Sequence, residues 1–275
     1  WKRIVIDDLI PCRGGKPIFT QPHGNEMWVL LLEKAFAKYV GDYGKLEGGM
    51  PLWAMEAMTG SNVSHFTLQT KTTKTTTTAG GGGESEGTWQ RMELVHEETK
   101  MAKRRCGLRE VVEARTMKKE QYGTEEFFRI LETYEQQDAC MAAYSYGSSD
   151  KASNHGIVRG HAYSILGVKH VRSDHREIRF VQLRNPWGTF EWDGEWSDKS
   201  PLWEKHPDIA SALKVSTAEG GAAGSDDGVF WMTLKDVREN YTHLVWVETF
   251  PEDWPNPNPN PNPSVLLCLN NPTYT

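Results

Sequence analysis

The sequence predicts an α+β fold, with helices in the first part of the chain and an antiparallel sheet in the last part. In two segments, one after Asn25 and one near Thr124, apolar residues recur three or four positions apart, which is the spacing of one helix face. After Gly156 the pattern changes to runs of β-branched and aromatic residues separated by polar or glycine-containing turns, which is typical of strands. Such a separation of helices from strands favours the α+β class.

Residues 1–60 are predicted to form a mostly helical unit that begins with a short strand at residues 4–6, followed by an acidic turn. Asn25 can cap the next helix, because its side-chain oxygen can accept a hydrogen bond from an unpaired backbone N–H. One wide apolar face of that helix is formed by Trp28, Leu31, Leu32, Ala35, Phe36, Tyr39 and Val40. Gly41 and the Gly48-Gly49 pair are expected to end this unit near Gly60.

Residues 69–120, approximately, are predicted to be a low-complexity insertion. A Thr/Lys run at residues 70–78 and four glycines at residues 80–83 cannot make a packed core. Residues 90–119 are highly charged and predict a helix of marginal stability. A firmer helix begins near Thr124, where two glutamates favour the positive end of the helix dipole, and its buried stripe is Phe127, Phe128, Leu131 and Tyr134.

The last part of the chain is predicted to contain strands at residues 162–171, 177–183, 228–233 and 243–250. A second insertion, rich in glycine and alanine, occupies residues 217–225. Residues 251–263 repeat Asn-Pro, which predicts a stiff extended spacer. We therefore expect three parts: residues 1–60, residues 61–250 that include the insertion, and a linker at residues 251–275 that begins a following region.

Composition excludes several classes of protein. The formal net charge of -6 gives no reason to expect a nucleic acid partner. The longest apolar run, residues 27–32, is too short to span a bilayer. The cysteines are widely spaced and form no CxxC pair, so we expect reduced thiols and an intracellular, cytoplasmic location. The chain begins with Trp1, so we expect sequence upstream of it.

His161 and Asn185 are the candidate catalytic residues. His161 follows Gly160 and precedes one predicted strand, whereas Asn185 follows the next strand and precedes Pro186 and Trp187. A carboxamide oxygen that accepts the imidazole N–H would hold the tautomer whose other nitrogen faces a thiol, and would stabilise a thiolate–imidazolium pair. Gly160 would allow close approach of substrate, and Trp187 could shield the hydrogen bond from water.

Each of these residues also has an ordinary structural interpretation. His161 could be a satisfied histidine beside a strand, Asn185 a turn former, and Trp187 part of the core. The chain itself offers no suitable nucleophile: Cys140 follows a helix and Cys106 lies in a basic segment, and neither has the strand-to-helix setting that presents a thiol beside an oxyanion hole.

Several motifs in a fixed order make the chain resemble the catalytic domain of calpains, the calcium-dependent, papain-like cysteine endopeptidases. The similarity covers roughly residues 1–60 and 122–250, and it is carried by residues 4–8, 25–28, 31–38, 160–164, 183–188, 191–192, 194, 196–198 and 227–232. The resemblance implies a papain-like α+β fold with a truncated helical first lobe, a second lobe built on an antiparallel sheet, and an active cleft between them. It also implies that His161 is the general base and that Asn185 orients it.

The resemblance implies that the nucleophile lies in a Gln-Gly-x-x-Gly-Asp-Cys-Trp type segment upstream of Trp1, with a glutamine that contributes to the oxyanion hole. We therefore expect residues 1–275 alone to be inactive. The complete protein would carry out limited intracellular proteolysis of protein substrates, and further domains are expected beyond both ends. An alternative is a catalytically inactive calpain-like binding or regulatory module.

Calcium is the cofactor that the resemblance implies. The matching positions in the second lobe are Glu191, Asp198 and Asp227, with the backbone carbonyl of Ser225, and Glu26 matches a ligand of the first-lobe site. Val229 departs from the family pattern, which commonly has a carboxylate there. The acidic stretch around residues 191–198 could instead be a solvated turn.

Overall fold

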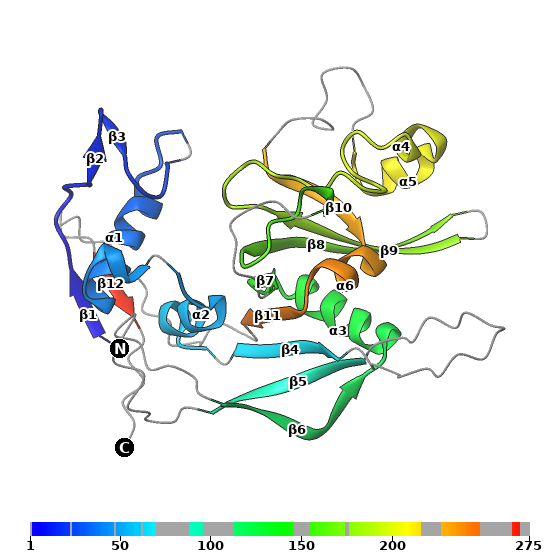
Figure 1. Ribbon diagram of the computed structural model, residues 1–275, viewed down its shortest axis with the longest axis horizontal. Helices are drawn as coiled ribbons and strands as arrows, with labels where there is room; N and C mark the ends of the chain where they lie inside the picture. Colours follow the sequence, from blue (N-terminus) through cyan, green and yellow to red (C-terminus); the bar gives the residue numbers. More distant parts are fainter. Residues whose placement is uncertain are drawn as a thin grey trace. The chain divides into compact units, whose positions relative to one another are not determined.

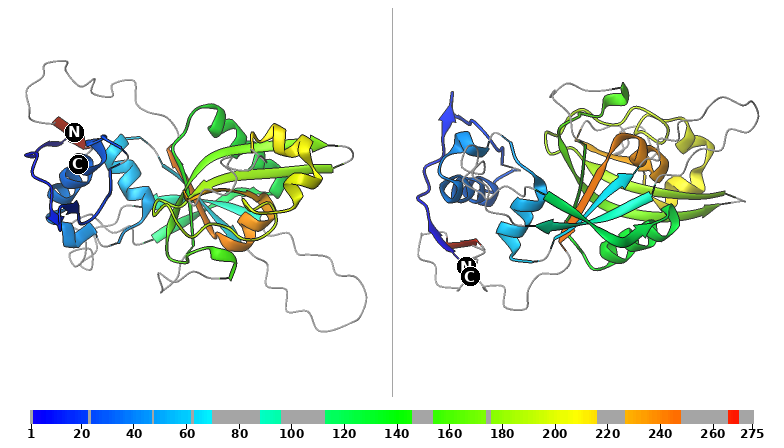
Figure 2. Two further views of the ribbon diagram at one scale, coloured as in Figure 1. Left: turned by 90° about the horizontal axis from the view of Figure 1, so that it is seen from above. Right: turned by 60° about the horizontal axis from the view of Figure 1, so that its bottom comes forward.

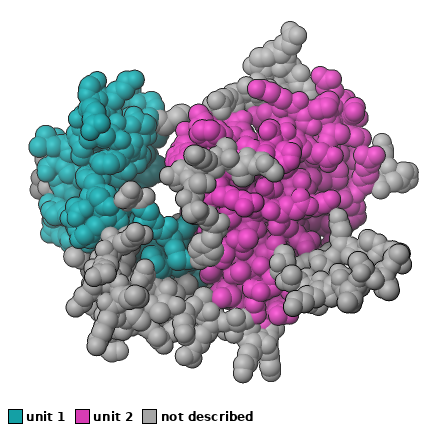
Figure 3. All heavy atoms as spheres, in the orientation of Figure 1, with its two compact units in different colours: residues 1–63, 94–115, 249–275 teal, residues 64–93, 116–248 magenta. Residues whose placement is uncertain are grey.

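The computed structural model describes residues 2–22, 24–46, 48–61, 63–69, 88–95, 113–145, 154–173, 176–215, 227–247 and 266–269. The chain divides into two units (Figure 3). Unit 1 contains residues 1–63, 94–115 and 249–275, and unit 2 contains residues 64–93 and 116–248. No helix in the described ranges is both long and apolar enough to cross a membrane.

Unit 1 combines short strands with two helices (Figure 1). Strand β1 (Lys2–Val5) pairs antiparallel with β12 (Leu266–Leu269), from the other end of the chain. The other elements are β2 (Cys12–Arg13), β3 (Lys16–Pro17), α1 (Trp28–Val40), the 3-10 helix η1 (Tyr43–Leu46) and α2 (Pro51–Thr59). Ile4 and Ile6 pack with Ala35 of α1, so the first strand and the helix share one small core.

The predicted first helix is confirmed, but its first turn differs from the prediction. Helix α1 begins at Trp28 after Met27, and no side chain caps it, so the predicted capping role of Asn25 is wrong. Trp28 is 62% exposed and lies outside the buried face, which consists of Leu30, Ala35, Ala37 and Val40. Helix α2 ends as expected at Gly60, which adopts the left-handed conformation that glycine favours at this position.

Unit 2 is built on an eight-stranded sheet with the strand order β10-β9-β8-β7-β11-β4-β5-β6. Its elements are β4 (Val63–Gln69), β5 (Thr88–Val95), β6 (Glu113–Tyr122), α3 (Thr124–Gln136), β7 (Met141–Tyr144), η2 (Asn154–Gly156), β8 (Ala162–Ser173), β9 (Arg176–Arg184), α4 (Leu202–Lys205), α5 (Pro207–Ala212), β10 (Val229–Thr233), α6 (Leu234–Asn240) and β11 (His243–Val247). Strands β8 and β9 form a long antiparallel hairpin with α4 and α5 beside it (Figure 2).

Side chains from both faces of this sheet are buried, because helices cover both. On one face, Phe127, Phe128 and Leu131 of α3 pack against a core that also contains residues of α6. On the other face, Phe180 and Trp231 pack against Trp203 of α4 and Ile209 of α5. The alternation of side chains along a strand separates the two cores: Phe180 contributes to one and Val181 to the other.

The predicted α+β class is confirmed, as are the helix at Thr124 and the four predicted strands after Gly156. The predicted marginal helix at residues 90–119 is wrong, because the described residues at its two ends belong to β5 and β6. Pairing with β4 satisfies the backbone of β5, and Trp89 is fully buried at its start. Strands β4 and β7 were not predicted. The predictions for residues 70–83, 217–225 and 251–263 lie outside the described residues.

Candidate active site at the ends of strands β8 and β9

The ends of two neighbouring strands bring His161 and Asn185 together. His161 immediately precedes β8, and Asn185 immediately follows β9. Because the two strands are antiparallel, with Ser164 opposite Arg184, both residues lie at the same edge of the sheet. His161 Nε2 lies 2.8 Å from Asn185 Oδ1, which is a hydrogen-bond distance.

The orientation of the Asn185 side chain is fixed by its other contacts. Its Nδ2 donates to the backbone carbonyls of Thr189 at 2.6 Å and Phe190 at 3.3 Å. Its Oδ1 accepts from the Trp187 N–H at 3.1 Å. Because the amide nitrogen faces two acceptors, the oxygen must face His161. Asn185 is completely buried, so water does not compete for these hydrogen bonds.

This arrangement selects one tautomer of the neutral His161 ring. The amide oxygen is an acceptor, so the proton of the imidazole must reside on Nε2. The lone pair is then on Nδ1, which is the nitrogen that can accept a proton from another group. A neutral carboxamide therefore orients the imidazole without adding a charge to the site.

Aromatic rings fix the plane of the imidazole. The Trp187 ring lies over His161, with a centroid distance of 4.1 Å and an interplanar angle of 35°. Tyr163 meets His161 edge-on at 5.3 Å. Trp187 is 47% exposed, so the ring covers the imidazole from solvent rather than filling the core. Gly160 has a φ of 74°, a backbone conformation that favours glycine at this position.

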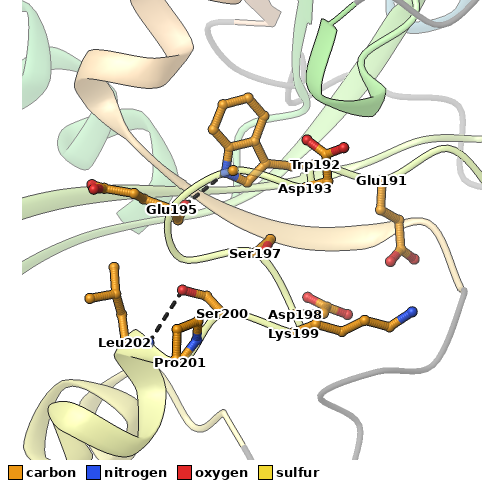
Figure 4. Close-up of a pocket in the computed structure, with 11 residues that line it drawn as sticks. Glu191, Trp192, Asp193, Glu195, Ser197, Asp198, Lys199, Ser200, Pro201 and Leu202 are labelled. Atoms are coloured by element: carbon orange, nitrogen blue, oxygen red, sulfur yellow. Dashed lines mark hydrogen bonds between the residues drawn. The ribbon is translucent and has the colours of Figure 1, made fainter.

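The acidic residues after Asn185 border a pocket of about 640 Å³. Figure 4 shows the carboxylates of Glu191 and Asp198 pointing toward one another, with Lys199 nearby. Trp192 also lines this pocket and donates from Nε1 to the carbonyl of Glu195 at 2.7 Å. Hard carboxylate oxygens are ligands that suit Ca²⁺.

Of the other predicted calcium ligands, Asp227 and Glu26 do not line this pocket. Asp227 Oδ1 accepts from the Val229 N–H at 2.9 Å, and Ser225 lies outside the described residues. Glu26 belongs to unit 1, where it accepts from Trp28 Nε1 at 3.2 Å. Within the ranges that the structure describes, no three His, Cys, Asp or Glu side chains are grouped to hold a metal ion. The donor chemistry fits calcium, but the described ligand set is incomplete.

The described cysteines do not complete a catalytic site. Cys140 precedes Met141, and Met141 pairs with Ile165, which lies four residues after His161. At about 3.3 Å per residue, Cys140 is therefore displaced from His161 along β8 by more than about 13 Å. Burial raises the pKa of the Cys140 thiol, although the residue as a whole is exposed, and this disfavours the thiolate. Cys12 lies in the exposed β2–β3 hairpin of unit 1.

The sequence did not reveal the backbone groups that hold the Asn185 amide. Thr189 and Phe190 act through their carbonyls, so their side-chain types carry no signal. Gly228 was also missed as a contact of Asn185. Its position after an acidic pair and before an aromatic strand predicts a turn but does not identify the partner of that turn.

Comparison with known proteins gives consistent similarities. A family profile described as "Calpain family cysteine protease" matches residues 1–248. The chain is 29% identical to calpain-9 of Homo sapiens and 29% identical to the calpain-1 catalytic subunit of Mus musculus, each over 246 residues, which is 88% and 89% of this chain. It is 30% identical to the calpain-type cysteine protease DEK1 of Arabidopsis thaliana over 92% of its length. The matched part is 27% of the length of each animal protein and 9% of the plant protein.

Proposed function

We propose a function from one premise, that the chain belongs to the calpain family of cysteine proteases. With its helices and large antiparallel sheet, it has the predicted papain-like α+β class. Within this family we propose that His161 is the general base of an endopeptidase, that Asn185 orients it, and that the substrates are proteins. The observation that carries the proposal is the 2.8 Å hydrogen bond from His161 Nε2 to Asn185 Oδ1.

The proposed reaction follows from this geometry. Nδ1 of His161 takes the proton of a cysteine thiol, and the thiolate attacks the carbonyl carbon of the scissile peptide bond. The C–N bond breaks as the imidazolium returns the proton to the leaving amine, which leaves an acyl-thioester. Water then attacks the thioester, again with His161 as the base, and releases the acid and the thiol. Asn185 keeps Nε2 protonated in every step.

We propose that the thiol comes from a part of the protein outside residues 1–275. The raised pKa and the position of Cys140 support this, as does the small share of each relative that the chain matches. We also propose intracellular action, since Cys12 and Cys140 are free thiols. Secretion of the tagged full-length protein would contradict that location.

The direct test uses the full-length protein and a cysteine-directed epoxide. Wild type should be labelled and should cleave an unfolded protein substrate. His161→Ala should abolish both, whereas His206→Ala, another half-buried histidine of unit 2, should retain both. Labelling that survives in His161→Ala would mean that another group is the base. Wild-type protein that is neither labelled nor active would favour the inactive binding or regulatory module instead.

We propose in addition that Glu191 and Asp198 provide oxygen ligands for calcium, with Asp227 and the Ser225 carbonyl completing the site. The proposal is supported by the two carboxylates that border one pocket. Bound calcium would neutralise their charge and hold the loop; no step of the reaction above depends on it.

Terbium, a calcium substitute, tests this site, because Trp192 borders the pocket and can sensitise its luminescence. Glu191→Gln combined with Asp198→Asn should abolish a signal that calcium displaces. Glu195→Gln should preserve it, since this side chain points away from the other two in Figure 4. Equal luminescence in all three proteins would refute the proposed ligands.

A further inference from the structure

We propose that Glu191 is a positioning residue for the His161–Asn185 pair, and that it acts through two glycines, Gly228 and Gly156, independently of any metal. The inference rests on the proposed function, because it concerns the same site. Its basis is that the side chain of Glu191 contacts the loop that holds Asn185, while its backbone contacts the segment that leads into His161.

The side chain of Glu191 holds Gly228 against Asn185. The Gly228 N–H donates to Glu191 Oε1 at 2.6 Å, and the Gly228 carbonyl accepts from the Asn185 N–H at 2.8 Å. Gly228 therefore bridges the carboxylate and the backbone of the orienting residue. A hydrogen bond to a charged carboxylate is stronger than one between neutral groups, so Glu191 holds the loop before β10 strongly at Gly228.

Close packing makes the position of Gly228 sensitive to small displacements. A Cβ atom at this position would lie 2.6 Å from the Asn185 carbonyl oxygen and 3.0 Å from Gly188 Cα. The φ of Gly228 is +83°, a conformation that other residues rarely adopt. A shift of Gly228 must therefore move the turn that contains Asn185, because no free space separates the two segments.

The backbone of Glu191 is packed equally closely against Gly156. A Cβ atom on Gly156 would lie 2.0 Å from the Glu191 carbonyl oxygen, and the φ of Gly156 is +77°. The next residues, Ile157 and Val158, are buried, and the Val158 N–H donates to the Tyr163 hydroxyl of β8 at 2.9 Å. The segment that enters β8 at His161 is thus fixed on one side by Glu191 and on the other by the sheet.

These contacts explain why a half-buried carboxylate lies six positions after Asn185 in the chain. Glu191 connects the loops before β8, after β9 and before β10, and two of these loops carry the proposed base and its orienting amide. A role as metal ligand alone would make Glu191 dispensable in the absence of calcium. A positioning role predicts that its loss loosens the His161–Asn185 hydrogen bond even in chelator.

The test uses residues 1–275 in chelator and the NMR signal of the proton on His161 Nε2. That proton is observable only when a hydrogen bond slows its exchange with water. We expect a visible signal in wild type and at least tenfold faster exchange in Glu191→Ala. Glu191→Gln should restore the signal, because its amide oxygen can still accept the Gly228 N–H. Glu195→Ala is the matched control and should not change it.

The outcomes separate this inference from the function on which it rests. Absence of the signal in wild type would contradict the proposed orientation of His161 itself. A signal present in wild type and unchanged in Glu191→Ala would refute only the positioning role. If Glu191→Ala does not fold, Glu191→Asp decides: the shorter side chain keeps its charge but cannot reach Gly228. In chelator, the proton on His161 Nε2 should then exchange with water at least tenfold faster in Glu191→Asp than in Glu191→Gln, and equal rates would refute the role.

Discussion

Lowering the pH from 7.5 to 4.5 is expected to destabilise unit 2 through two stacked histidines. The rings of His65 and His243 lie 5.3 Å apart at 23°, and Tyr144 stacks on His243 at 4.8 Å. His65 is 3% exposed and His243 is 7% exposed. The Tyr144 hydroxyl lies 3.1 Å from His65 Nε2, the Thr242 hydroxyl lies 2.7 Å from His243 Nδ1, and His65 Nδ1 has no hydrogen-bond partner among the described residues. A second proton on His65 would therefore be a buried donor with no acceptor among the residues that the structure describes.

The size of this loss in the free energy of unfolding follows from the two pKa values. Burial and, to a smaller extent, the charge of the nearby His243 lower the pKa of His65 to about 4, and burial lowers the pKa of His243 to about 4. The unfolded chain binds these protons near pH 6.5, so the stability contributed by the neutral pair is complete above that pH and is lost as the pH falls toward 4. At pH 4.5 the loss is about 2–3 kcal/mol for one histidine and on the order of 5 kcal/mol for both. This loss is a large part of the free energy of unfolding of a typical domain, which is about 5–15 kcal/mol.

Urea unfolding followed by tryptophan fluorescence at several pH values from 7.5 to 4.5 measures this loss. A double variant, His65→Phe with His243→Phe, keeps two flat rings but cannot titrate, so its free energy of unfolding should fall by several kcal/mol less than that of wild type. His155→Gln, at an exposed histidine, should behave like wild type. The reasoning is refuted if the double variant loses as much stability as wild type over the same pH range.

Three smaller substitutions test the fold of unit 2 by the same unfolding measurement. Thr233→Ala removes the side chain that accepts the Asp236 N–H at the start of α6 and should cost about 1 kcal/mol; an unchanged stability would show that the cap contributes nothing. Leu131→Ala empties a fully buried position of α3 and should cost about 2–5 kcal/mol, so a cost below 1 kcal/mol would mean that the core collapses around the site. Glu125→Gln breaks an ion pair with Arg179 at the surface and should cost less than about 1 kcal/mol, with a larger loss contradicting the view that this pair is solvated.

The local pattern of the sequence was sufficient for elements that carry their own signal. The apolar spacing after Thr124 predicted α3, and the β-branched runs after Gly156 predicted β8, β9, β10 and β11. These predictions succeeded because the residues of one helix or strand share a period of burial that neighbouring positions reveal. The residue types at two strand ends suggested His161 and Asn185 as a pair, and the structure brings their side chains into contact; their catalytic role stays a prediction.

Elements whose identity depends on a distant partner could not be predicted in this way. Residues 88–95 form a strand because β4 pairs with them and because the core buries Trp89, and neither condition is visible in their charged composition. Strand β7 is a buried segment of four residues, too short to show a clear alternation of its own, and its place between β8 and β11 is set by the sheet.

The chain by itself therefore determined the class of fold, the family and the types of the two residues proposed for the chemistry. Only the tertiary structure decided the strand order of the sheet, the direction of the Asn185 amide and the contacts of Glu191 with two distant glycines. The physical reason is that these features depend on backbone groups brought together from separate loops. Backbone carbonyls and N–H groups are the same in almost every residue, so the sequence does not record which of them will meet.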